Sequence, residues 1–259
     1  MLIKFQPKQV LMLIIALSSF QLFAEEKPKE EKPFKRVMIG VHFSPDVAYR
    51  VVTKKNNDAI TNLIIKEVKN QEIPKFGYTV GVNTLINIKS FVGIEAGIWY
   101  MNMGYQIKWR EVNFGSQWTG SHYNPNINTG DSIALVKLVY DYHYIGIPLT
   151  VNFTIGKGKV RFFAGAGLAV NFLVSNTNTD IIKGYEPKNG KSTNKGYANI
   201  KLVNLIPILE AGIDYKINSR MNLKVSPCFK FGALNLSPDT PIGEHLFNGG
   251  IKIQYYFGI

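Results

Sequence analysis

Apolar and polar side chains alternate along eight stretches of this chain, and this alternation predicts β-strands. Between Arg161 and Ser175, one face carries only uncharged apolar side chains and the other is rich in Gly and polar residues. Successive side chains of a strand point to opposite faces, so each such stretch has one apolar and one polar side. The predicted strands span residues 36–52, 75–88, 91–108, 133–155, 160–175, 200–217, 221–236 and 246–257.

The connections between these strands alternate between short and long. Hairpin-sized turns are expected at residues 89–90, 156–159 and 218–220, and longer polar connections at 53–74, 109–132, 176–199 and 237–245. Outer-membrane barrels have short periplasmic turns and long outer loops, and an even strand count leaves both termini in the periplasm. The predicted fold is all-β, an eight-stranded antiparallel transmembrane β-barrel in up-and-down order.

The apolar faces of the predicted strands carry no charge. A row that includes Leu223, Val225 and Phe229 is typical, and a lysine or arginine facing mid-bilayer lipid would cost about 2–4 kcal/mol. A soluble barrel or sandwich also alternates and is the alternative. Eight aromatic residues are placed where interfacial girdles could form: Trp99, Tyr100, Tyr140, Tyr142, Tyr144, Tyr215, Tyr255 and Tyr256.

The N-terminus predicts export. Residues 1–24 combine Lys4 and Lys8 with a short apolar core, which is the pattern of a cleaved signal peptide. Residues 25–35 form a charged, proline-containing lead-in expected to be flexible in the periplasm, and residues 36–259 form the barrel. Removing residues 1–24 takes away two lysines and no acid, so the formal charge falls from +12 to +10.

This basic balance fits anionic lipid head groups as well as nucleic acid. An exported protein rarely meets nucleic acid, so no nucleic-acid partner is predicted. No later stretch approaches the roughly 20 apolar residues of a membrane helix. The expected location is therefore the cell outer membrane, with lipid and lipopolysaccharide as surroundings. Cys228 is the single cysteine and is expected to be a buried filler.

Several charged side chains are predicted to point into the barrel. An eight-stranded barrel has room only for its own side chains, so a diffusion pore is not expected, and these charges must pair or remain hydrated. We predict a structural network that links Glu95 and Glu210 to lysines of the last two strands; a proton relay or catalytic pair is the disfavoured alternative. The predicted members are Glu95, Arg161, Glu210, Asp214, Lys224, Lys230 and Lys252.

Candidate sites for catalysis and metal binding are weak. The four histidines show no metal-ligand spacing. Ser121, His122 and Asp131 form the one compact trio of hydrolase type, and residues 124–131 faintly resemble a calcium loop without its closing glutamate. A turn-rich loop explains both features better. No catalytic, metal or cofactor-binding residue is predicted, and the protein is expected not to be an enzyme.

A basic loop follows the fifth predicted strand. It carries Lys183, Lys188, Lys191 and Lys195. Such a loop could contact the anionic phosphates of lipopolysaccharide, since a lysine near an anionic membrane gains about 1 kcal/mol. The preferred interpretation is an ordinary solvated loop.

Two segments carry a family resemblance. The sequence Tyr-Asp-Tyr-His-Tyr-Ile-Gly-Ile-Pro-Leu at 140–149, and the following hairpin into Phe-Phe-Ala-Gly-Ala-Gly at 162–167, resemble the PorT-like family of bacterial outer-membrane β-barrel domains. The last aromatic residue, Phe257, stands two positions from the end, where such chains commonly end on an aromatic residue. The resemblance implies insertion by the barrel-assembly machinery, and some relatives are accessory factors in protein secretion.

The predicted function follows from the membrane location and this resemblance. We expect a non-enzymatic accessory or interaction subunit of a larger outer-membrane complex for secretion, uptake or assembly. The alternative is a stand-alone adhesin or envelope-stabilising barrel that acts through its loops. An outer-membrane enzyme that modifies lipids or cleaves proteins is a remote third.

Overall fold

Eight long strands form the body of the protein. The computed structural model describes residues 36–56, 58–114, 118–119, 122–123, 132–184, 190–196 and 199–259, and the predicted signal peptide and lead-in lie outside these ranges. The eight strands are β1 (Val37–Lys54), β3 (Lys75–Lys89), β4 (Val92–Phe114), β7 (Ser132–Ile155), β8 (Val160–Lys183), β10 (Val203–Lys216), β11 (Met221–Phe231) and β12 (Ile242–Gly258).

The eight strands close into a ring. Each pairs antiparallel with the next along the chain, β8 pairs with β10, and β12 returns to β1 with Ile39 opposite Phe257. Closure satisfies the backbone N–H and C=O groups between strands, which is the condition for a sheet to cross a bilayer. The predicted eight-stranded up-and-down barrel is confirmed.

The outside of the ring is apolar. Outward side chains of β7 at 145–153, β8 at 162–174 and β10 at 203–215 include no charged residue, and Ile147, Leu168 and Leu209 are 56%, 55% and 60% exposed. A soluble sandwich would bury these rows, because exposed apolar area costs about 25 cal/mol per Å² in water. The exposure of these rows therefore shows that the apolar face of each strand lies outside the barrel and the polar face inside.

The predicted aromatic girdle is wrong for five of its eight members. Tyr100 is half-buried on the outside, and Tyr215 and Tyr255 are exposed. Neighbouring residues of a strand face opposite sides, so Trp99 cannot join Tyr100, nor Tyr256 join Tyr255. The five members that lie buried inside the barrel are Trp99, Tyr140, Tyr142, Tyr144 and Tyr256.

The first long connection contains a helix where only a loop was predicted. Helix α2 (Ala59–Gln71) begins after Asp58, whose carboxylate accepts a hydrogen bond from the Thr61 backbone N–H at 2.6 Å. Ile65 is buried against the barrel, and β2 (Glu72–Ile73) then pairs with β4. Among the described residues, no helix has the length and apolar character needed to span a membrane.

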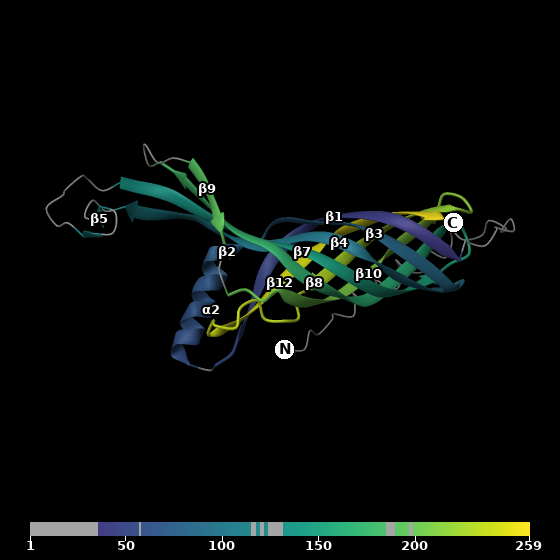
Figure 1. Ribbon diagram of the computed structural model, residues 1–259, viewed down its shortest axis with the longest axis horizontal. Coiled ribbons are helices and arrows are strands. Elements are labelled where there is room, and N and C mark those ends of the chain that lie inside the picture. The colour runs from purple at the N-terminus through teal and green to yellow at the C-terminus, as the bar shows by residue number, and fades with distance from the viewer. Residues whose placement is uncertain are drawn as a thin grey trace, which may run out of the picture.

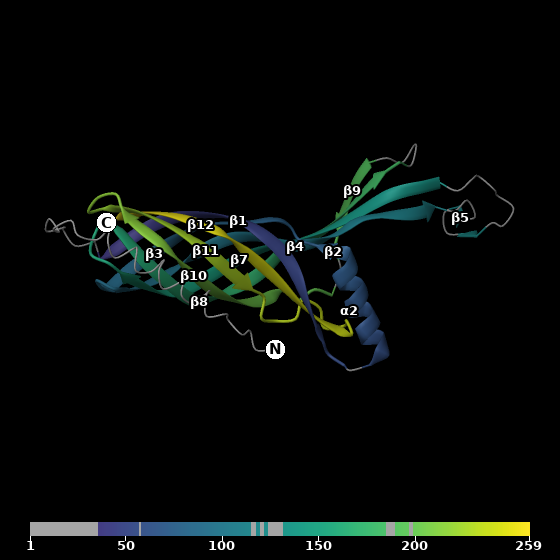
Figure 2. The ribbon, with the colours of Figure 1, turned by 180° about the vertical axis from the view of Figure 1, so that it is seen from behind.

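Strands β4, β7 and β8 run beyond the ring and form a protruding sheet (Figure 1). Here β8 also pairs with β9 (Gly190–Lys195), and the short β5 (Trp118–Thr119) and β6 (His122–Tyr123) pair with each other. We call residues 108–114, 132–139, 177–183 and 190–195 the arm. The view from behind shows the arm and α2 at one end and the C-terminus at the other (Figure 2).

The arm corrects two predicted loops. Residues 109–114 and 176–183 are strand rather than connection, because the hydrogen-bonded ladder continues past the apolar belt into polar sequence. The turns at the opposite end remain short, at residues 90–91, 156–159 and 217–220. Long and short connections thus lie at opposite ends of the barrel, as predicted.

Candidate functional site

The centre of the barrel holds a buried ion-pair network. Lys252 Nζ lies 3.3 Å from Glu95 Oε1 and 3.4 Å from Glu210 Oε2. Glu95 also accepts hydrogen bonds from Asn83 Nδ2 at 2.7 Å and Asn152 Nδ2 at 2.9 Å. All three charged side chains are at most 4% exposed, so a single lysine from β12 bridges carboxylates from β4 and β10.

A second buried pair lies closer to the mouth of the barrel, where the arm begins. Lys230 Nζ contacts both oxygens of Asp46, at 2.7 and 2.9 Å. Asp46 also accepts hydrogen bonds from Ser44 Oγ at 2.6 Å, Thr79 Oγ1 at 2.7 Å and Asn248 Nδ2 at 3.2 Å. The sequence analysis omitted Asp46. Alternation along β1 identifies Asp46 as an inward residue, because the polar residues at alternate positions of this strand share the inward face.

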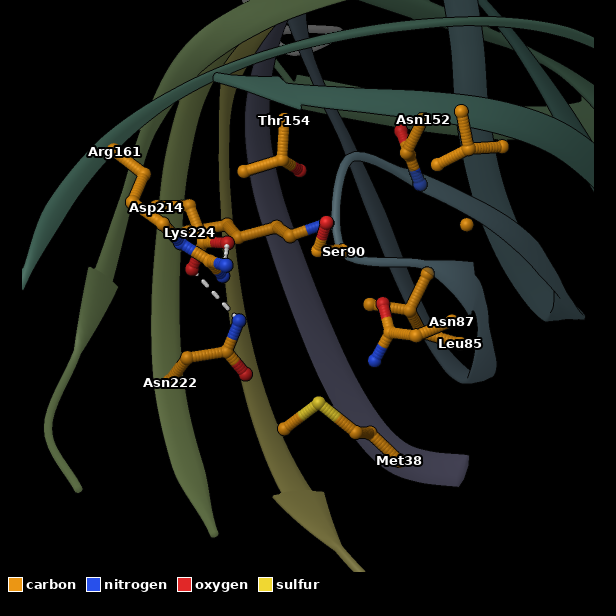
Figure 3. A pocket seen from close by; sticks show the side chains of 12 residues that line it. Met38, Leu85, Asn87, Ser90, Asn152, Thr154, Arg161, Asp214, Asn222 and Lys224 are labelled. Atoms are coloured by element: carbon orange, nitrogen blue, oxygen red, sulfur yellow. Dashed lines mark hydrogen bonds and ion pairs between the residues drawn. The ribbon is translucent and has the colours of Figure 1, made fainter. Parts of the chain in front are cut away.

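The short-turn end is closed by a third cluster (Figure 3). Arg161 forms an ion pair with Asp214, which also accepts a hydrogen bond from Asn222 Nδ2 at 2.7 Å. The space left among these side chains is about 10 Å³, which is the scale of one water molecule. Little space is therefore left among these side chains.

Lys224 differs from the prediction that it joins an ion pair. No carboxylate of the described residues lies within ion-pair distance of it. Its Nζ lies 4.7 Å from the ring centroid of Phe163 and 5.3 Å from that of Tyr256. Two aromatic faces therefore contact this buried ammonium through cation–π interactions. Cys228 is fully buried, as predicted.

A layer of large side chains separates the charged clusters from the mouth. Along β4 the inward residues run from Glu95 to Trp99, Met101 and Met103, which are at most 2% exposed. Trp99 Nε1 donates to Asn171 Oδ1 at 2.9 Å over Gly146 of the intervening strand β7. Trp99, Met101 and Met103 belong to one buried cluster that also includes Tyr144, Ile206, Ile208, Leu236 and Leu246 and reaches the tyrosines of the mouth.

Above this layer, the mouth contains a cavity of about 470 Å³. Arg50 is bound bidentately by Glu72 and contacts Glu244 Oε1 through Nη1 at 2.7 Å. Burial raises the pKa of Glu72, and hydrogen bonding to Arg50 and the charge of Arg50 oppose that shift. Tyr105 stacks on Tyr140 with centroids 4.6 Å apart. No sequence pattern predicts this site, because its walls come from segments distant in sequence.

The lysines of the predicted basic loop lie mostly on the arm. Strand register pairs Leu135 with Lys183, and Ile181 with both Lys137 and Lys191. Lys195 lies opposite Thr177. Lys137, Lys183, Lys191 and Lys195 therefore share one face of the arm, because these positions are two residues apart along each strand. We call them the lysine face; Lys188 lies outside the described residues.

The weak chemical candidates stay untested. Ser121 and Asp131 lie outside the described residues, as does the side chain of His122, and the calcium-like loop at 124–131 is also outside them. Within the described part of the chain, no group of three or more His, Cys, Asp or Glu side chains is arranged to hold a metal ion.

A scan of protein families matches residues 23–235 to the outer membrane protein beta-barrel domain. The chain belongs to this family. The barrel is accordingly a protein of the bacterial outer membrane, as predicted. The apolar outer face of the ring is its lipid-facing surface. The arm and α2 lie at the end of the barrel that carries the long connections. A search of curated proteins found no match.

Several solved outer-membrane proteins are similar in structure at low identity. Neisserial surface protein A is 8% identical, with 84% of this chain and 95% of that chain covered and a TM-score of 0.40. OprG from Pseudomonas aeruginosa is 10% identical, with 89% and 100% covered and a TM-score of 0.42. Ail, the attachment invasion locus protein of Yersinia pestis, is 7% identical, with 86% and 99% covered and a TM-score of 0.35.

Proposed function

We propose that this barrel is a non-enzymatic interaction protein and an accessory subunit of a larger outer-membrane complex. The observation that carries the proposal is the arm, a four-stranded sheet held outside the membrane by strands continuous with the barrel. A sheet already fixed by its own hydrogen bonds docks without the ordering cost of a flexible loop. The PorT-like resemblance, which includes accessory factors of secretion, supports the same role.

The arm has free edges for a partner. Among the described residues, 110–114 of β4 pair with β7 alone, and β9 pairs with β8 alone. An open edge can accept a strand from another protein through main-chain hydrogen bonds. Lys108 and Arg110 on one edge, with Lys191 and Lys195 on the other, give both edges positive charge. We therefore propose a partner with an acidic docking surface.

The interior supports an anchoring role for the barrel. Charged clusters fill the lumen, the residual space at the short-turn end is about 10 Å³, and the large side chains around Trp99 form a further layer. A barrel filled in this way presents surfaces and does not conduct solutes. Its buried carboxylates are engaged by cations and amides, which supports a structural rather than catalytic use of them. Insertion by the barrel-assembly machinery is part of this proposal.

The test is a comparison of two variants by affinity purification in mild detergent. The first variant replaces residues 108–137 and 179–193 with Asn-Gly turns, which join the paired residues Ile107 with Leu138 and Asn178 with Asn194. The second replaces the lipid-facing Leu223, Val225 and Phe229 with alanine. Barrel folding is checked for both by the folded and unfolded bands seen on electrophoresis without and with heating.

We expect a stoichiometric partner with the native protein, and its loss from the arm-shortened variant alone. Loss from the alanine variant alone would move the docking surface from the arm to the lipid face. A native protein that purifies as a monomer, without a partner, would overturn the accessory role.

The lysine face favours a second candidate, a stand-alone barrel that stabilises the envelope or adheres through its outer surface. Alternation along β7 puts Lys137 on the same side as the lipid-facing Ile145 and Ile147. The lysine face therefore continues the lipid face upward, toward the phosphates of surrounding lipopolysaccharide. Each lysine near an anionic surface contributes about 1 kcal/mol. Changing all four lysines to glutamine should reduce co-purified lipopolysaccharide if this candidate is correct.

A further inference from the structure

The cavity at the mouth of the barrel borders the buried cluster of the interior. Its wall residue Tyr105 is the next inward residue of β4 after Met103, and both belong to that cluster. Its volume, about 470 Å³, is within the usual range of about 300–1,000 Å³ for small-molecule sites.

The lining of this pocket is negatively charged, whereas the protein as a whole is positively charged. The whole chain is basic, with a formal charge of +12. The lining has one cation, Arg50, against three carboxylates, Glu72, Asp239 and Glu244. Lys55 lies nearby, where its Nζ donates to the carbonyls of Pro238 and Thr240 at 3.2 and 2.8 Å. Even with Lys55 counted, the pocket remains negative.

The walls already hold one cation against an aromatic ring. The Arg50 guanidinium carbon lies 4.1 Å from the ring centroid of Tyr105. Tyr140 and Tyr142 have their rings within 27° of parallel to Tyr105, with centroids 4.6 and 6.5 Å away. Tyrosine faces attract cations, and the attraction grows where water is excluded. The aromatic wall thus suits a positive group attached to an apolar body.

We propose that this pocket binds a small organic cation, a primary amine carried on an aromatic or aliphatic body. The tyrosine wall receives the apolar body, and the carboxylates of Glu244 and Asp239 receive the ammonium group. Arg50 holds Glu72 and one oxygen of Glu244 in place and so acts as a positioning residue. This site is independent of the arm and of the complex proposed above.

Glu244 and Asp239 are the acids best placed for this role. Both oxygens of Glu72 are used by Arg50, whereas Arg50 contacts only Oε1 of Glu244. Asp239 is exposed, and its Oδ2 accepts a hydrogen bond from Asn199 Nδ2 at 2.6 Å. Each carboxylate accepts several hydrogen bonds when ionised, so both retain capacity for an ammonium donor.

The test uses three probes that share a phenyl ring and a two-carbon chain and differ in charge. They are 2-phenylethylamine, 2-phenylethanol and phenylacetate. The full chain is folded into a polyoxyethylene detergent, which has neither an amine nor a sugar head group, and binding is measured by titration calorimetry. We expect the amine to bind at least about tenfold more tightly than the alcohol, a difference of about 1.4 kcal/mol, and phenylacetate to bind most weakly.

Variants locate the site. Asp239→Asn lies outside the Arg50 cluster and should leave the fold intact while weakening amine binding about fivefold; Glu244→Gln should weaken it about tenfold, each with the alcohol unchanged. Glu67→Gln is the matched control, because Glu67 is an exposed acid on α2 and not part of the pocket. Equal binding of the three probes, no amine binding at millimolar concentration, or equal effects of Glu67→Gln and Asp239→Asn would each overturn the proposal.

Discussion

Replacing Lys230 with methionine tests whether the lumen is a dry, paired interior. Lys230 and Asp46 have side chains 1% and 0% exposed, and the Nζ–Oδ2 distance is 2.7 Å. Methionine keeps the length and approximate volume of lysine but removes its charge. The substitution therefore leaves the Asp46 carboxylate without a cation in a place that water does not reach.

The expected loss of stability follows from the contacts that remain. Removing one partner of a buried ion pair costs about 3–5 kcal/mol. Asp46 keeps its hydrogen bonds from Ser44, Thr79 and Asn248, and donors to a charged acceptor are worth about 1.5–3 kcal/mol each. These contacts limit the loss, so we expect about 3 kcal/mol, the lower end of the range.

A double variant separates charge from packing. Asp46→Asn combined with Lys230→Met removes both charges, so no carboxylate is left unpaired. Replacing a whole buried pair is far less damaging than removing one partner. The double variant should therefore be more stable than Lys230→Met alone, by about 2 kcal/mol. Lys159→Met, the same chemical change in an exposed turn, should change stability by less than about 0.5 kcal/mol.

The measurement is reversible urea unfolding of the barrel folded into lipid vesicles, followed by tryptophan fluorescence. Free energies come from linear extrapolation, and equal slopes show that the variants unfold comparable surface. A loss below about 1 kcal/mol for Lys230→Met, with no recovery in the double variant, would refute the paired interior and indicate a hydrated lumen. Steady single-channel conductance of porin size in planar bilayers would refute it independently.

Three further predictions concern packing, lipid and the helix. A methyl group added by Gly146→Ala would lie 1.7 Å from Asn171 Oδ1 and 2.2 Å from Trp99 Nε1; we expect a loss of about 1–3 kcal/mol and a shifted tryptophan emission, and an unchanged spectrum would contradict the close packing. Leu168→Arg, at the centre of an outward row of β8, should cost about 2–4 kcal/mol in vesicles, and a neutral result would contradict the lipid-facing assignment. The hydrogen bond from the Thr61 backbone lowers the pKa of Asp58 below its usual 3.8; a lowered folded pKa stabilises α2 above pH about 3.8, and this support is lost as pH falls through the folded value. The protection factors of the α2 amides, which correct for the pH dependence of intrinsic exchange, should fall at low pH, and Asp58→Asn, which retains a capping oxygen, should weaken that dependence.

The order of strands and their two faces could be read from the sequence, because side chains of a strand alternate with a period of two. The same alternation identified Glu95, Glu210 and Lys252 as inward residues. It did not state which inward charges meet. Asp46 and Lys230 are 184 positions apart, and only the closure of β12 onto β1 brings β1 beside the strands that carry the lysines.

The aromatic prediction is wrong because it departs from this alternation. Trp99, Tyr144 and Tyr256 are predicted at membrane interfaces, but each lies inside the barrel, on the face opposite its outward neighbour. Local pattern does not predict pairing between distant segments: polar sequence at 177–183 resembles a loop until the neighbouring strand supplies its hydrogen bonds. The mouth cavity also depends on contacts between distant segments, because its residues come from four separate parts of the chain: Arg50, Glu72, Tyr105 and Glu244. The sequence by itself determined eight strands with one apolar and one polar face and predicted an apolar outside; pairing across long separations, which alternation does not encode, determined the ion pairs, the arm and the pocket.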